Sequence, residues 1–219
     1  MIITCIGHAK FLIELENGMR IVTDPYDATC GYPVTDVAAD VVLVSHGHHD
    51  HNAVDTMPGT PVIINAAGLH EISPRVMVQA VEADHDDAGG TKRGKTLMFV
   101  IEAEGLRAAH LGDLGHLPTP QQCSQLGRID VLMVPVGGHY TIDAQTAKAT
   151  AELLQARVVL PMHYRTTANA DWPIQPVTAF TALYDHPGEY LDQLRVAAGD
   201  LSCQPDIAVL TPQSLTEGE

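Results

Sequence analysis

The sequence predicts an α/β protein in which strands outnumber helices, folded as a single domain over residues 1–219. Residues 41–45 form a continuous apolar, β-branched run, which is typical of a strand covered on both faces. Asn17-Gly18 separates two strand-like segments and indicates a hairpin, because both positions of such a turn need positive φ. Residues 143–155 show helical spacing of small and apolar side chains, and Asp143 can cap their start. Neither a linker nor a fixed-period repeat divides the chain.

Further elements are expected where short apolar runs lie between turn residues. The expected strands are 11–15, 19–23, 41–45, 61–64, 76–79, 97–101, 107–111, 131–134, 158–161 and 207–210. The expected helices are 119–126, 143–155 and 177–184. Residues 165–176 are polar and carry two prolines and the only tryptophan, Trp172. They are expected to form a long loop of the kind that often acts as a lid.

Composition excludes several partners and compartments. The 219 residues include 27 acidic and 12 basic side chains, for a net charge of -15. So acidic a chain lacks the electrostatic footprint of a nucleic-acid binder or of a polybasic membrane attachment. There is no signal-peptide pattern and no apolar run long enough to span a membrane, and the four cysteines form no Cys-x-x-Cys pair. We therefore expect a cytoplasmic protein with free thiols and a small-molecule substrate, and without nucleic-acid or membrane partners; homo-oligomerisation stays open.

The segment Ser45-His46-Gly47-His48-His49-Asp50-His51-Asn52 carries the strongest chemical signal. It follows directly on the buried strand 41–45, and α/β proteins place their sites at the carboxyl ends of strands. Imidazole nitrogens and a carboxylate oxygen are ligands for divalent transition metals. On a turn, His46 and His48 can face one point while Asp50 and His51 face another, which suits two ions side by side. A surface cluster of histidines is the alternative.

This segment, His-x-His-x-Asp-His after an apolar strand, resembles the signature of the metallo-β-lactamase superfamily. Later motifs follow in the order of that family: Asp84-His85-Asp86, the Gly112-Asp113 pair after a strand, and Met162-His163-Tyr164. The opening segments 6–14 and 23–26 resemble the small bacterial and archaeal branch that includes L-ascorbate-6-phosphate lactonase. The resemblance extends over roughly residues 1–164. It implies a four-layer αββα sandwich with two mixed sheets and helices outside.

The resemblance also implies a metal-ligand set. His46, His48 and His85 would hold one divalent ion, Asp50, His51 and His163 would hold the other, and Asp113 would bridge them. Zn2+ is the expected metal, although Mn2+ or Fe2+ would also suit these ligands. Two such ions can share a water, lower its pKa and orient it as a hydroxide nucleophile. Asp50 and Asp113 would thereby serve catalysis as well as binding.

Other polar residues are candidates for the substrate side. His8, His116, His139 and Arg165 are expected around the substrate, with His116 and His139 as acid–base catalysts. Exposed loop positions are the alternative for both histidines, and a surface ion pair is the alternative for Arg165. Asp24 is expected to accept a hydrogen bond from a ligand imidazole and to fix its tautomer, unless it only shapes the turn before Pro25.

The predicted function is hydrolysis of a small polar ester, lactone or similar bond at a dinuclear metal centre. His48 stands where the flavin-linked di-iron oxidoreductases of this superfamily have a carboxylate, so hydrolysis is favoured over redox chemistry. A phosphodiesterase or nuclease of the same fold is one alternative, which a basic groove would favour. A non-catalytic metal-binding or ligand-sensing protein is another, which a missing ligand would favour. All seven ligand positions are filled.

Overall fold

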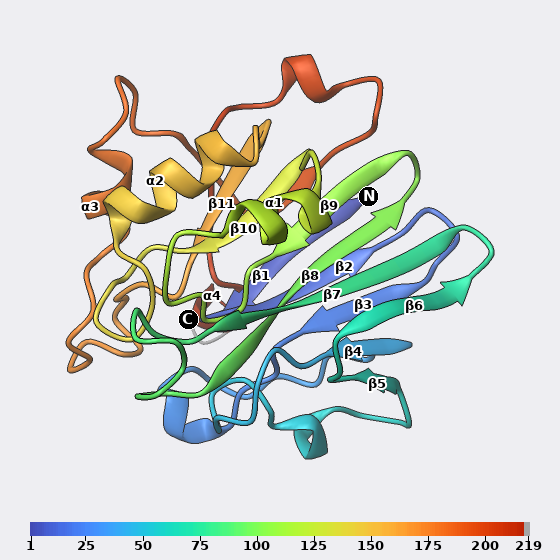
Figure 1. Ribbon diagram of the computed structural model, residues 1–219. Helices are drawn as coiled ribbons and strands as arrows, with labels where there is room; N and C mark the ends of the chain where they lie inside the picture. The colour runs from blue at the N-terminus through green and yellow to red at the C-terminus, as the bar shows by residue number, and fades with distance from the viewer. Residues whose placement is uncertain (217–219) are drawn as a thin grey trace.

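Two six-stranded sheets face each other in the structure, a computed structural model that describes residues 1–216 (Figure 1). The first sheet has the order β13-β1-β2-β3-β4-β5 and the second the order β11-β10-β9-β8-β7-β6. The strands of the first sheet are β1 (Ile2–Gly7), β2 (Lys10–Glu14), β3 (Arg20–Thr23), β4 (Val41–Leu43), β5 (Val62–Ile64) and β13 (Leu194–Arg195). Those of the second are β6 (Gly68–Ser73), β7 (Val76–Asp84), β8 (Lys95–Ala103), β9 (Leu106–His110), β10 (Val131–Pro135) and β11 (Val158–Met162). A small third sheet pairs β12 (Glu189–Leu191) with β14 (Ala208–Leu210).

The main core lies between the two sheets. Ile13 and Leu43 from the first sheet and Phe99 and Met133 from the second belong to one buried apolar cluster, and all four are fully buried. Burial of this many large apolar side chains is the dominant stabilising contribution to such a sandwich.

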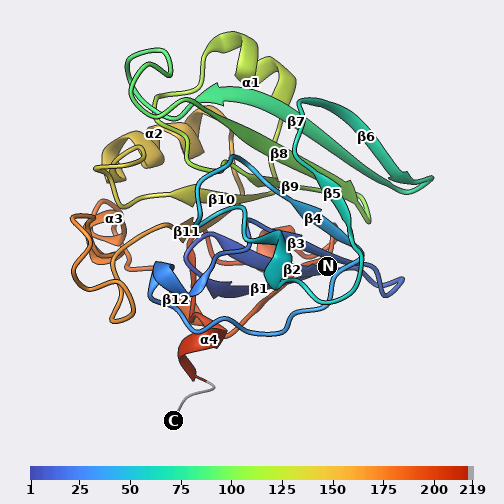
Figure 2. The ribbon, with the colours of Figure 1, turned by 90° about the horizontal axis from the view of Figure 1, so that it is seen from below.

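The outer layers differ on the two sides. The second sheet is covered by α1 (Pro120–Leu126) and α2 (Ala144–Leu153), with α3 (Thr178–Thr181) beside α2 (Figure 2). Thr119 and Gln122 form a capping box at the start of α1, and Asp143 caps α2. The first sheet is covered by a segment with two short 3-10 helices, Ala28–Cys30 and Val54–Thr56, and by α4 (Gln213–Thr216) against β1. The architecture confirms the predicted αββα sandwich, with a thin fourth layer.

Strand direction places the site. Both sheets are mixed: β3, β4 and β5 run parallel, as do β9, β10 and β11, and the other pairs among these twelve strands are antiparallel. With these pairings, β1, β3 and β4 of the first sheet point the same way, and so do β7, β9 and β11 of the second. The loops that leave their carboxyl ends form one edge of the sandwich.

Some predicted strands are shorter than the observed ones, and several observed strands were not predicted. The expected strands 76–79 and 97–101 are the central parts of the nine-residue strands β7 and β8. The strands β1, β6, β12 and β13 were not predicted, and the expected helix 177–184 contains only the four-residue α3. Among the described residues, no helix is long and apolar enough to cross a membrane.

Candidate metal centre

Six of the strands that point toward the site edge are followed by polar residues of the site. His8 follows β1, Asp24 follows β3, and the His46–His51 segment begins three residues after β4. In the second sheet, the residue after β7 is His85, the Gly112-Asp113 pair lies just beyond β9, and the residue after β11 is His163. Six strands from two sheets therefore bring residues that are far apart in the sequence to one place.

Three left-handed backbone positions turn side chains into this site. His8, Asp24 and His163 have φ values of 55°, 38° and 53°. Residues other than glycine rarely adopt this conformation, and it is held only where the surrounding structure compensates its cost. Three of the six non-glycine residues with positive φ among residues 1–216 therefore lie at this site.

Asp113 lies at the centre of the cluster. Its Oδ2 atom is 3.3 Å from Nε2 of His85, 3.3 Å from Nε2 of His163 and 3.8 Å from Nε2 of His46. Its Oδ1 atom is 3.2 Å from Nε2 of His51. The side chain is almost fully buried, and its backbone amide donates to Oγ1 of Thr96. One carboxylate thus contacts imidazoles from both halves of the cluster.

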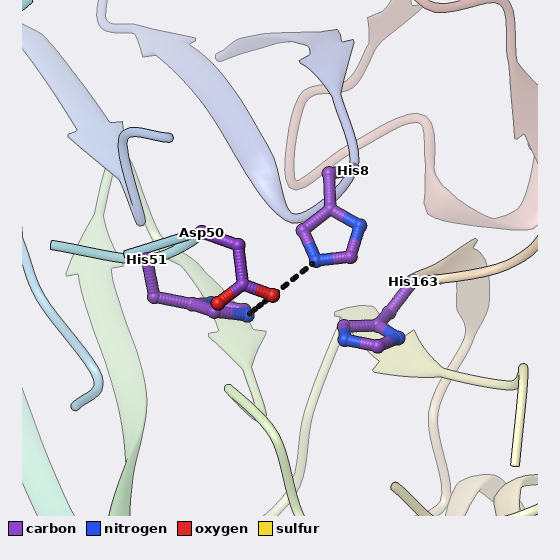
Figure 3. A group of neighbouring side chains, drawn as sticks. All are labelled: His8, Asp50, His51 and His163. Carbon is purple, nitrogen blue, oxygen red and sulfur yellow. Dashed lines mark ion pairs between the residues drawn. The ribbon is translucent and has the colours of Figure 1, made fainter. Parts of the chain in front are cut away.

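The remaining donors form two groups on either side of Asp113. In one, His46, His48 and His85 converge, with Nε2 of His46 2.9 Å from Nδ1 of His48. The other contains His8, Asp50, His51 and His163 (Figure 3). In that group, Oδ2 of Asp50 is 3.3 Å from Nε2 of His8 and 3.6 Å from Nε2 of His51.

The donor set fits metal ions better than hydrogen bonding. Nε2 of His8, His51 and His163 and Oδ1 of Asp113 are buried without a hydrogen-bond partner among the described residues. Buried polar atoms without partners are uncommon, and an ion is one of the standard reasons for them. In each group the imidazole nitrogens and carboxylate oxygens lie within 4.8 Å of one another. Such a set of donors suits Zn2+, Mn2+ or Fe2+.

Electrostatics set the protonation state of several groups in the cluster. Burial lowers the pKa of His8 to about 4 and that of His46 to about 3, so both rings are neutral at pH 7. Burial raises the pKa of Asp113, but the neighbouring His163 and His51 outweigh it and hold that pKa well below its usual range. Metal ligands must be deprotonated, and His8, His46 and Asp113 already are. Burial lowers the pKa of His51, but Asp113 and Asp24 outweigh it and raise that pKa well above its usual value, so this ring would release a proton on binding an ion.

Asp24 orients a ligand histidine, as the sequence predicted. Oδ2 of Asp24 lies 2.8 Å from Nδ1 of His51, and both side chains are fully buried. The same carboxylate accepts from the backbone amide and the hydroxyl of Ser45, each at 2.7 Å. His110 belongs to neither metal-ligand group: its Nε2 atom lies 2.9 Å from the carbonyl oxygen of Ala9. His49 forms a hydrogen bond with Thr29 and belongs to neither donor group, although it lines the cavity over the cluster.

His8 is the residue whose place differs most from the sequence prediction. It was expected beside the substrate, and the structure places it inside a ligand group, with its ring centre 4.1 Å from that of His163. The reason is the left-handed φ of His8, which no spacing in the sequence reveals. The candidate ligand set therefore has eight members.

The structure does not bring the other three substrate candidates to the metal cluster. Both ring nitrogens of His116 are within hydrogen-bond distance of the backbone, Nδ1 of Leu117 O and Nε2 of Asp84 N. His139 is exposed and lines a neighbouring cavity. Arg165 is also exposed, and its backbone amide donates to Gln175. Although Arg165 is only two residues after His163, its side chain does not line the cavity over the cluster.

A cavity of about 350 Å³ opens over the cluster, and sequence reasoning missed part of its lining. Arg93, Tyr140 and Trp172 line it together with cluster residues. Trp172 contacts His8, with ring centres 5.3 Å apart, and this confirms that the loop 165–176 reaches the site. The only feature of the sequence that could have indicated a role for Arg93 is the small basic segment Lys92-Arg93-Gly94-Lys95 in an otherwise acidic chain.

Comparison with known proteins agrees with this geometry. The family described as "Beta-lactamase superfamily domain" matches residues 2–163. The chain is 32% identical over 200 residues to a UPF0173 metal-dependent hydrolase of Archaeoglobus fulgidus, covering 76% of this chain and 84% of that protein. It is 30% identical to another of that name from Methanoregula boonei, covering 88% of this chain and 98% of that protein.

A solved structure is similar over almost the whole chain. It is a protein of Thermotoga maritima described as a Zn-dependent hydrolase of the metallo-β-lactamase superfamily, with 38% identity, a TM-score of 0.79, and coverage of 95% of this chain and 97% of that one. The metallo hydrolase Igni18 of Ignicoccus hospitalis, at 23% identity and a TM-score of 0.64, shares the fold. The chain therefore belongs to the metallo-β-lactamase superfamily and is a metal-dependent hydrolase of it.

Proposed function

We propose that this protein hydrolyses a small polar ester or lactone at a centre that holds two divalent metal ions. The observation that carries the proposal is the arrangement around Asp113, whose two oxygens face imidazoles from two separate donor groups. His46, His48 and His85 would hold one ion, and Asp50, His51 and His163, together with His8 from the same donor group, would hold the other, with Asp113 between them. Zn2+ is supported by the description of the Thermotoga maritima relative as Zn-dependent.

Bound ions of this kind supply an acidified water as nucleophile and polarise the oxygen of the bond that is broken. The protein's own residues orient that chemistry. Asp24 holds a proton on Nδ1 of His51 and so directs the lone pair of Nε2 toward Asp113. Asp50 has the more exposed of the two carboxylates in the cluster, and it lines the cavity, so it is placed to accept a proton from a water there.

The cavity favours a small substrate. Its volume of about 350 Å³ is at the low end of the range for ligand pockets, and Tyr140 and Trp172 form aromatic walls. We further propose that nucleic acid and membranes are not partners, because 27 acidic side chains outnumber 12 basic ones. Hydrolysis of a phosphodiester is the second candidate reaction. A phosphodiester is included in the test because the same metal chemistry would hydrolyse it.

The test is a hydrolysis screen of protein loaded separately with Zn2+, Mn2+ and Fe2+. The panel contains lactones, carboxylic esters, thioesters and bis(p-nitrophenyl) phosphate. We expect turnover of lactones or esters that is lost when a chelator is added and absent in Asp113→Ala. Adding metal back should restore the activity of the wild-type protein but not that of Asp113→Ala. Turnover of the phosphodiester alone would favour the second candidate. No metal-dependent turnover of any class would contradict both.

A further inference from the structure

The loop between β7 and β8 is built around a single buried carboxylate, that of Asp86. Its oxygens accept hydrogen bonds from the backbone amides of Ala88, Gly90, Lys92 and Arg93, at 2.8 to 3.0 Å. The loop therefore has one defined shape.

This loop joins a metal-ligand position to a position at the mouth of the cavity. Its first residue is His85, whose backbone amide donates to the carbonyl of Gly94 at 3.0 Å and closes the base of the loop. Gly115 packs against the same point so closely that a Cβ atom there would lie 2.1 Å from the amide nitrogen of Asp86. Arg93 is thus held at a fixed place relative to His85.

Arg93 has the features of an anion-binding group. It lines the cavity, it is half-buried, and its guanidinium carbon lies 5.6 Å from the ring centre of Tyr140. Among residues 1–216 no carboxylate forms an ion pair with it. The adjacent Lys92 differs in each respect: its ammonium pairs with Asp87 at 2.7 Å, and it is exposed and does not line the cavity.

We propose that Arg93 binds an anionic group of the substrate, a carboxylate or a phosphate, while the bond to be hydrolysed lies at the metal cluster. The guanidinium presents a planar fork of donors that matches either group, and stacking on Tyr140 fixes its orientation. Asp86 is a positioning residue, because it holds the backbone that carries Arg93. This inference rests on the proposed function and narrows its substrate class to small anionic esters or lactones.

The test uses binding, so that it does not depend on turnover. Trp172 is the only tryptophan and lines the cavity, so its fluorescence reports occupancy there. Zinc-loaded protein is titrated with acetate, succinate and 2-phosphoglycolate. Acetate can occupy the metals alone, whereas the other two carry a second anionic group that can reach Arg93. The measured quantity is the ratio by which each bifunctional ligand binds more tightly than acetate.

We expect at least one ratio to exceed roughly tenfold, the scale of one hydrogen bond to a charged group. That ratio should collapse in Arg93→Gln, recover partly in Arg93→Lys, and stay unchanged in Lys92→Gln. The arm with the larger ratio identifies carboxylate or phosphate. Asp86→Asn should lower the ratio, and adding Arg93→Gln to it should have little further effect, as expected for residues that act together.

Ratios near one for both ligands would overturn the proposal, as would an equal loss of acetate and succinate binding in Arg93→Gln. An unchanged ratio in that variant would overturn it as well. These results are separable from failure of the proposed function. If no ester or lactone is hydrolysed, the titrations still report whether Arg93 binds anions beside the metals. If hydrolysis is found, the preference for an anionic over a neutral ester should fall in Arg93→Gln by the same factor as the binding ratio.

Discussion

Nδ1 of His51 lies 2.8 Å from Oδ2 of Asp24, and Nε2 on the opposite side of the same ring lies 3.2 Å from Oδ1 of Asp113. Both carboxylates and the imidazole are buried. The first contact holds a proton on Nδ1, so that Nε2 is the nitrogen that would give up its proton and bind a metal ion. Burial raises the pKa of Asp24, but the charge of His51 and its hydrogen bond lower it below the usual value. Asp24 would therefore act on a bound metal ion through His51.

Removal of the Asp24 charge should weaken metal binding without removing a ligand. In Asp24→Asn we expect metal affinity or activity to fall by roughly 10- to 100-fold, the usual cost of losing a partner of a metal-bound histidine. Competition with a chromophoric chelator measures the affinity. Asp27→Asn is the matched control, because Asp27 contacts the exposed His49 and not a ligand. Equal affinities for wild type and Asp24→Asn would contradict this account.

His8 should behave as a metal ligand and not only as a substrate contact. His8→Ala is expected to lower metal occupancy, because its Nε2 atom lies in the same donor group as Asp50, His51 and His163. Elemental analysis after dialysis against weak chelator measures occupancy directly. Full occupancy combined with slow hydrolysis would return His8 to the substrate side, where the sequence alone had placed it.

His139→Ala and Arg165→Ala should change kcat/KM by less than about threefold, because both side chains are exposed and neither lines the cavity over the cluster. General acid–base catalysts typically contribute 10²-fold or more, so the two outcomes are well separated. His116→Ala should instead lower the melting temperature, since its ring bonds to the backbone on both sides. A hundredfold loss of kcat in His139→Ala would restore the catalytic role that the sequence suggested.

The four cysteine thiols should react with a disulfide reagent at rates that follow their burial. Burial raises the pKa of Cys5 to about 12 and also raises that of Cys30, so both remain protonated thiols at pH 8 and cannot attack a disulfide reagent. Cys203 is exposed and Cys123 half-buried. With Ellman's reagent we expect one fast thiol, absent in Cys203→Ser, one slower thiol, and two more only after unfolding. Rapid labelling of all four in the folded protein would contradict the buried positions.

The seven predicted ligands come together because each follows a strand that ends at the site edge, a relation that apolar runs and motif order both indicate. Other features depend on packing that a linear pattern does not carry. The strand β6 was missed because none of its residues is fully buried, which leaves no apolar pattern to detect. His8 enters the cluster through a left-handed turn, and Arg93 reaches Tyr140 only because the Asp86 loop folds back. Arg165, close to His163 in sequence, is exposed and does not line the cavity over the cluster.

The central claim is that the cluster around Asp113 holds two metal ions, and the metal content of the purified protein tests it most directly. Protein prepared without chelator and reconstituted with Zn2+ should contain two ions per chain by inductively coupled plasma mass spectrometry. His48→Ala and His163→Ala should each lose one ion preferentially, because they belong to different donor groups, and Asp113→Ala should lose both. A single ion per chain in the fully active protein, or full activity with none, would contradict the claim.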